Sequence, residues 1–301
     1  MSDKLFQTFC WLCALWIPAV LLVILFRLVG SSAEAWNTFG WKFLISCEWN
    51  PVEGKFGAIP AILGTLLTTG MAIFLAVPLG FLTAFFLSDV PPWLGKPLSH
   101  ALDLLAAIPS VIYGMWGLFV LAPIMQKYVQ PWMLDSLGLR YLPFVGKDGN
   151  GFGFFTAGVV LTLMILPYIS AIMRDVFSMT PTLLREAAFG IGCTRWEAAW
   201  DITVRYGLRG LLGGIFIGLG RALGETMAVL FIIGNVIRVP SGIFDSGTTI
   251  AATLANHFAE ADGLMRSVLF ALGLILLVLA FGVQVLAWYY LQATKKQRGE
   301  A

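Results

Sequence analysis

Long runs of apolar residues, with few polar interruptions, dominate the pattern along this chain. A helix needs about 20 mainly apolar residues to cross a bilayer core of ~30 Å. Six runs meet that length: Phe9–Val29, Ile59–Leu87, Ala101–Met125, Phe154–Met173, Leu208–Ile237 and Leu264–Leu291. The ten-residue alternation of a membrane β-barrel is absent from the sequence. The pattern therefore predicts an all-α fold, a polytopic membrane bundle of six transmembrane helices.

Composition supports a membrane protein. The 301 residues are 58% hydrophobic and 12% charged, whereas soluble domains carry roughly 25% charged residues. A net charge of +2 is too small to attract nucleic acid, so a nucleic-acid partner is excluded. With four cysteines and two histidines we expect no metal site. Cys10 and Cys13 are interpreted as small apolar residues of the first helix and His257 as a solvated side chain.

The distribution of Lys and Arg predicts the orientation. With both termini in the cytoplasm, more of these residues lie in the inner loops than in the outer ones, and the tail Lys295-Lys296-Gln297-Arg298 adds to the excess. The outer loops are then Gly30–Ala58, Gln126–Gly153 and Arg238–Gly263. We divide the chain into a first helix with its outer loop (1–58), a five-helix core (59–291) that contains the inner loop 174–209, and a cytoplasmic tail (292–301).

The small residues Ser31-Ser32-Ala33 after the first apolar run would suit a signal-peptide cleavage site. The run itself is longer than the 7–15 residues of a signal-peptide core. We therefore expect an uncleaved first transmembrane helix.

The most polar inner segment, Arg174–Arg209, contains the capping patterns of two short helices. Thr180-Pro181 combines an N-cap oxygen with a proline at the first helical position. Gly190–Gly192 permits a sharp turn, and Thr194–Glu197 has the sequence of a capping box. We expect two short helices joined at a glycine elbow on the cytoplasmic face. From the residues alone, a hairpin lying on the membrane surface remains an alternative.

The fifth apolar run carries two ionisable residues, Arg221 and Glu225. At 1.5 Å per residue they lie ~18 Å and ~24 Å into the run, where neither charge should face lipid. Their four-residue spacing predicts an ion pair on one helix face, which Gly214 and Gly218 share. One hypothesis is a structural lock between helices. The other, which we favour, is that the Arg221 guanidinium binds an anion in a pathway.

Part of the inner loop resembles the EAA motif of ABC-importer permeases. Glu186-Ala187-Ala188 is followed at the motif's spacing by Gly192 and Ile202, although Arg205 replaces the proline that usually ends it. In that family the motif forms a coupling helix that docks on the ATPase subunit. The resemblance implies that Glu186 meets the ATPase, and it assigns to ATPase coupling the residues Glu186, Ala187, Ala188, Gly190, Gly192 and Thr194.

The segment Gly220–Asn235 closely resembles phosphate-specific permeases of ABC importers, the PstC type, and Ile108–Gly114 and Glu186–Thr194 agree. The resemblance implies the type I ABC-importer permease fold, with Arg221, Glu225 and Thr226 in the substrate pathway. It also implies four kinds of partner: a sister permease in a heterodimer, two ATP-binding cassette subunits, an external phosphate-binding protein and the lipid bilayer of the inner membrane.

No Gly-x-x-x-x-Gly-Lys-Ser/Thr loop occurs in the sequence. We therefore expect the chain not to be an enzyme, to hold no cofactor, and to leave ATP and Mg²⁺ to its partner subunits. Open alternatives are a permease for sulfate or molybdate, a membrane subunit that senses phosphate and signals, and an ATP-independent carrier. The lack of an internal repeat argues against the carrier.

Overall fold

The computed structural model describes residues 2–136, 138, 141–142, 144–146 and 149–297. Within these residues the regular elements are all helical, which confirms the all-α prediction. Five helices are long and apolar enough to cross a membrane. They are α1 (Ser2–Phe39), α3 (Ile59–Asp89), α7 (Phe154–Ser178), the continuous helix Arg195–Leu223 and α13 (Gly263–Gln297).

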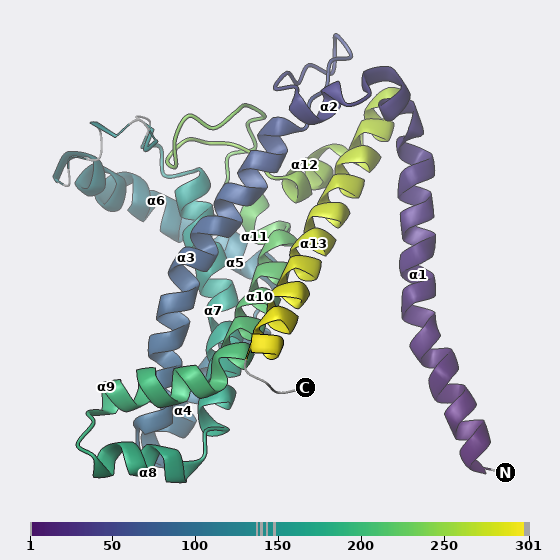
Figure 1. The fold of residues 1–301 in the computed structure, drawn as a ribbon. Helices are drawn as coiled ribbons and strands as arrows, with labels where there is room; N and C mark the ends of the chain where they lie inside the picture. Colours follow the sequence, from purple (N-terminus) through teal and green to yellow (C-terminus); the bar gives the residue numbers. More distant parts are fainter. Residues whose placement is uncertain (1, 137, 139–140, 143, 147–148, 298–301) are drawn as a thin grey trace.

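Shorter elements connect the long helices; several lie at the two ends of the bundle, whereas α5 and α11 lie in its middle (Figure 1). We call the end with α4, α8 and α9 the hairpin end, and the end with α2 and α12 the loop end. The bounds are α2 Lys42–Ile45, α4 Pro92–Ala107, α5 Ser110–Trp116, α6 Ala122–Ile124, α8 Thr182–Gly190, α9 Arg195–Glu197, α10 Arg205–Leu223, α11 Met227–Leu230 and α12 Ile250–His257, with π-helical turns at Gly117–Leu121, Met125–Val129, Trp132–Ser136 and Ala198–Val204.

The predicted third span, Ala101–Met125, is wrong as a single helix. α4 ends at Ala107, and the chain turns by 92° before the helix that runs from Ser110 to Ser136. Pro109 has no N–H to continue α4, and it biases the residue before it toward extended backbone. Ile108 has that backbone, with φ −67° and ψ 127°. Because the second helix reaches Ser136, the predicted loop 126–153 begins about three turns later than expected.

The predicted fifth span, Leu208–Ile237, is also wrong as a continuous helix. It begins earlier, at Arg195, and α10 ends at Leu223; after the short α11 the chain is irregular from 231 to 249. The irregular backbone forms hydrogen bonds inside the protein: Gly153 N donates to Ile232 O (3.1 Å) and Gly247 N to Ile233 O (2.9 Å). Buried partners of this kind are what permit irregular backbone at membrane depth.

The centre of the bundle is the packing of α7 against α3 and α10. One face of α10 is a ridge of glycines that lies directly on α7, with Gly207 and Gly210 on Val176, Gly214 on Ile172 and Gly218 on Ile169. A methyl group at Gly214 would stand 2.8 Å from Ile172 Cγ2. Small residues allow such close helix contacts in membranes, so the helix face that carries Gly214 and Gly218 is the surface on which α10 packs closely against α7.

α1 leans away from α13 toward the hairpin end (Figure 1). Near the loop end the two helices are joined by Ser267, whose hydroxyl accepts from Ala35 N (3.0 Å) and donates to Ser31 O (2.9 Å). The proposed cleavage site at Ser31–Ala33 is therefore an ordered part of α1. α1 begins, and α13 ends, on the hairpin-end side. Of the predicted tail 292–301, the part through Gln297 continues α13, and the rest lies outside the described residues.

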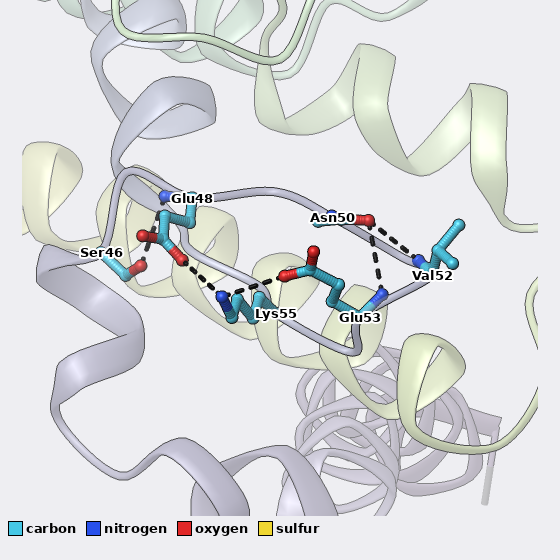
Figure 2. Close-up of polar contacts among 6 residues, drawn as sticks. All are labelled: Ser46, Glu48, Asn50, Val52, Glu53 and Lys55. Carbon is cyan, nitrogen blue, oxygen red and sulfur yellow. Dashed lines mark hydrogen bonds and ion pairs between the residues drawn. The ribbon is translucent and has the colours of Figure 1, made fainter.

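The loop between α2 and α3 is folded, as Figure 2 shows. Asn50 and Lys55 pair through their backbones (2.8 and 3.0 Å), and Asn50 Oδ1 accepts from Val52 N (3.1 Å). Lys55 Nζ lies 2.9 Å from Glu53 and 3.9 Å from Glu48. These contacts hold a small hairpin at the loop end.

Candidate functional site

The hairpin end contains the residues that the sequence assigns to coupling. The capping box is confirmed: Glu197 N donates to Thr194 Oγ1 (3.3 Å) and Thr194 N to Glu197 Oε2 (2.7 Å). The helix that it starts is not short, however, because it continues without a break to Leu223. Thr180 does not cap α8. Pro181 occupies the cap position, and the buried Thr180 hydroxyl has no hydrogen-bond partner.

The elbow between α8 and α9 is a Schellman motif. Gly192 has φ +92°, Gly192 N donates to Phe189 O (3.0 Å) and Cys193 N to Ala188 O (3.0 Å). These two bonds satisfy the last carbonyls of α8, and the left-handed residue between them favours glycine. The predicted glycine elbow is therefore confirmed at Gly192, whereas Gly190 lies inside α8.

α8 presents a mixed apolar and acidic surface to the outside. Leu183 and Ile191 are 74% and 84% exposed, and Glu186 and Ala187 are also exposed. We call these four residues the α8 surface. Ala188 points the other way and is buried. Exposed large aliphatic side chains around one carboxylate are typical of a protein contact.

Two contacts that the sequence analysis missed hold the hairpin to the end of α3. Asp89 Oδ1 accepts from Arg185 Nη2 at 2.8 Å, and Asp89 Oδ2 lies 4.0 Å from Arg195 Nη1. One turn before Asp89 in α3, Phe85 packs edge-on against Trp196, with ring centroids 5.6 Å apart. Asp89 belongs to no motif, so no sequence pattern singles it out.

Arg221 lies near the end of α10. Its guanidinium lies over the ring of Tyr168, with Cζ 4.2 Å from the ring centroid. It does not form the predicted ion pair with Glu225. α10 ends two residues before Glu225, so the i, i+4 geometry of a helix is lost. Glu225 Oε1 instead accepts from Ala228 N (3.2 Å) at the start of α11.

The arginine stands beside the 92° bend. The Tyr168 hydroxyl donates to Ala106 O (2.8 Å) and the Tyr113 hydroxyl to Leu105 O (2.9 Å). The two tyrosines thus donate to carbonyls in the last turn of α4, where helical partners run out. Leu105 O also accepts from Ile108 N at 3.3 Å. The structure brings Arg221, α7 and the bend together.

Thr226 lies apart from this arrangement. Its hydroxyl donates to Gly224 O (3.3 Å), and the residue lines a cavity of about 370 Å³ with apolar residues of α12 and α13. The predicted pathway residues therefore face more than one environment around the break between α10 and α11.

A bundle of long apolar helices, with one helix broken in the membrane beside an arginine and a capped hairpin at one end, defines a multi-pass transport protein of the permease class. The family model described as "Binding-protein-dependent transport system inner membrane component" matches residues 76–296, and the chain belongs to this family. It is thus a multi-pass inner-membrane transport subunit.

Curated relatives are similar along nearly the whole chain. The phosphate transport system permease protein PstC of Haemophilus influenzae is 46% identical over 99% of this chain and 96% of its own length. The protein of the same name from Mesorhizobium japonicum is 45% identical over 99% of this chain and 93% of its own length.

Solved structures show the same fold at low sequence identity. A chain of a bacterial ABC transporter that imports the acidic polysaccharide alginate has a TM-score of 0.61 at 18% identity, covering 96% of this chain and 98% of that one. A chain of the inward-facing MetNI methionine ABC transporter has a TM-score of 0.56 at 18% identity, covering 82% and 99%. The predicted ABC-importer permease fold is confirmed.

Proposed function

We propose that this chain is the permease subunit of an ATP-driven importer of inorganic phosphate. The observation that carries the proposal is the 46% identity, over almost the full length, to a phosphate transport system permease. The partners proposed are a sister permease, two ATP-binding cassette subunits that hold ATP and Mg²⁺, and an external phosphate-binding protein. The hairpin end would face the cytoplasm, with both termini on that side.

The α8 surface is proposed as the contact with an ATPase subunit. It is exposed, combines aliphatic side chains with Glu186, and lies on a helix whose C-terminal end is closed by the Gly192 motif. A capped hairpin transmits force better than a flexible connection, because its backbone groups are already bonded. Glu186, Ala187, Ala188, Gly190, Gly192 and Thr194 together form or position this contact.

Arg221 is proposed as a ligand of the transported anion. The Arg221 guanidinium lies over the Tyr168 ring, and the residue is exposed. The N–H edge of a guanidinium matches two oxygens of a tetrahedral anion at once. Glu225 and Thr226, in the break after α10, are proposed to line the same pathway.

The function is tested with the full assembly reconstituted in vesicles, with ATP on the hairpin side and the binding protein on the other. We expect uptake of radiolabelled phosphate that requires both ATP and the binding protein. Excess sulfate or molybdate should not inhibit this uptake. Uptake of sulfate or molybdate in preference to phosphate would contradict the proposed substrate. Phosphate uptake that does not need ATP would contradict the coupling.

A further inference from the structure

We infer that Asp89 is a positioning residue that couples the α8–α9 hairpin to α3, so that α3 moves with the hairpin during the transport cycle. The inference rests on the proposed function and extends it to a helix outside the hairpin. Nothing in the EAA resemblance includes this residue.

The first observation is the placement of the carboxylate. Asp89 is the last residue of α3, where the helix dipole disfavours a negative charge. Local helix electrostatics therefore do not explain an aspartate at this position. Its partners do: Arg185 at 2.8 Å comes from α8 and Arg195 at 4.0 Å from α9.

Of the two ion pairs of Asp89, the one with Arg185 is the stronger. The side chains of Asp89 and Arg185 are only 19% and 29% exposed, and charge-assisted bonds shielded from water are screened less by salt. Arg195 is 76% exposed, so its longer contact adds less. A single carboxylate thus links the end of α3 to both helices of the hairpin.

An aromatic cluster makes the same connection independently. Trp196 and Trp200 stack on each other with an interplanar angle of 17°. Phe81 of α3 lies edge-on to both, at 6.1 and 5.9 Å, and also contacts Phe177 of α7 at 5.5 Å. The start of the helix Arg195–Leu223 is thereby packed on α3 as well as joined to it by charge.

α3 extends from this contact to the other end of the molecule. Its 31 residues span ~46 Å at 1.5 Å per residue. Near the loop end, Thr65 Oγ1 accepts from Ile250 N (3.0 Å) at the start of α12. A displacement of α8 that is transferred to α3 thus reaches the loop end by a route separate from α10.

The test uses the reconstituted full assembly and measures phosphate imported per ATP hydrolysed. Asp89→Asn removes the charge at constant size. We expect the ratio to fall about fivefold or more, within the range of typical coupling energies, while ATP hydrolysis continues. The matched control is Asp201→Asn, which breaks an exposed ion pair (3.1 Å to Arg205) within one helix and should leave the ratio unchanged.

A second measurement separates coupling from docking. A cysteine introduced by Thr182→Cys should cross-link to the ATPase subunit equally well in the Asp89→Asn assembly and in its parent. If Asp89→Asn does not assemble, the same ratio is measured for Arg185→Gln. This substitution removes the shorter ion pair of Asp89 and keeps its contact with Arg195. If the assembled variant cross-links normally and imports as much phosphate per ATP as its parent, the inference about Asp89 is overturned. The proposed function is not affected by that result. A parent assembly without ATP-dependent uptake would overturn the proposed function and this inference with it.

Discussion

Gly192 determines the hairpin turn through its backbone conformation and not through its small size. A methyl group there would meet no atom within 4 Å, but φ is +92°. Gly192→Ala should therefore destabilise the turn by roughly 1–2 kcal/mol, the cost of a left-handed L-residue. We expect faster hydrogen exchange at the Cys193 amide and reduced ATP-dependent uptake.

Gly190→Ala is the control for this prediction. Gly190 is helical, and a methyl group there also meets nothing within 4 Å, so alanine should be neutral or slightly stabilising. Equal effects of the two substitutions would contradict the argument from backbone conformation.

Arg221 is predicted to need its planar side chain as well as its charge. Arg221→Lys keeps the charge and loses both the fork and the stack on Tyr168, so phosphate uptake should fall about tenfold or more. The control is Arg266→Lys, since Arg266 also lies over a ring, that of Phe258 at 5.9 Å, but belongs to α13 and not to the break after α10. It should retain uptake.

A double variant in which Arg221 and Glu225 are exchanged should lack phosphate uptake. An exchange preserves function only if the two side chains form an ion pair, and these two described residues have separate partners. The measurement is uptake normalised to the amount of assembled complex. Normal uptake by the double variant would show that the two side chains act as an interchangeable pair.

The sequence predicted local motifs better than side-chain partners. The Thr194 capping box needs only residues within one turn, so its sequence sufficed. The Arg221–Glu225 pair required the helix to continue, but α10 ends with Gly224 at its C-cap. Because α10 also contains glycines in its interior, Gly224 alone did not mark the break. Asp89 forms its contacts with residues 96 and 106 positions away, and sequence spacing carries no information at such separations.

At the scale of elements, the bend between α4 and α5 depends on two tyrosine hydroxyls. Tyr113→Phe removes the 2.9 Å bond to Leu105 O and leaves that carbonyl only its longer bond from Ile108 N (3.3 Å), which should destabilise the assembly by about 0.5–1.5 kcal/mol. The measurement is thermal unfolding of the purified complex. Tyr128→Phe, at an exposed position of the same helix, should leave the transition unchanged; a similar loss there would contradict the prediction.

The glycine ridge of α10 offers a second prediction about elements. Gly214→Ala places a methyl group against Ile172, and overpacking of this kind costs typically 1–3 kcal/mol. Gly213→Ala, one residue earlier, meets no atom within 4 Å. We expect a lower yield of folded complex for the first substitution only, measured by size-exclusion chromatography in detergent. Equal yields would show that α7 and α10 adjust to the added volume.

For the whole molecule, we predict that the hairpin end faces the cytoplasm. Reporter fusions after Gly54, Gly149 and Gly247 should be external, and fusions after Gly190 and Lys295 internal. A mature N-terminus near Ala33 would contradict the uncleaved first helix.

Hydrophobic runs predicted six spans. The described residues contain five long apolar helices, or six if the bent pair at Pro109 is counted as one span, and the runs did not show where two of the predicted spans break. Pro109 indicates that the helix is disturbed at this position. A proline does not, however, determine whether the helix is slightly kinked or turns by 92°. Residues Phe231–Ile233 continue the apolar run after α11, so composition favours a helix there. Their irregular backbone depends on bonds to Gly153, which directly precedes α7, and to Gly247, where the segment folds back on itself. Both donors are distant in sequence, so composition does not reveal them.

The segment 231–249 also imposes an order on assembly. Its carbonyls at Ile232, Ile243 and Asp245 accept from the backbone N–H groups of Gly153, Phe155 and Phe154, which lie at the start of α7. Long helices satisfy their own backbones and enter the bilayer independently, but this segment has no bonded state there until α7 is in place. It should therefore be the last part of the chain to acquire its native structure, after the helices on both sides of it have been inserted and packed.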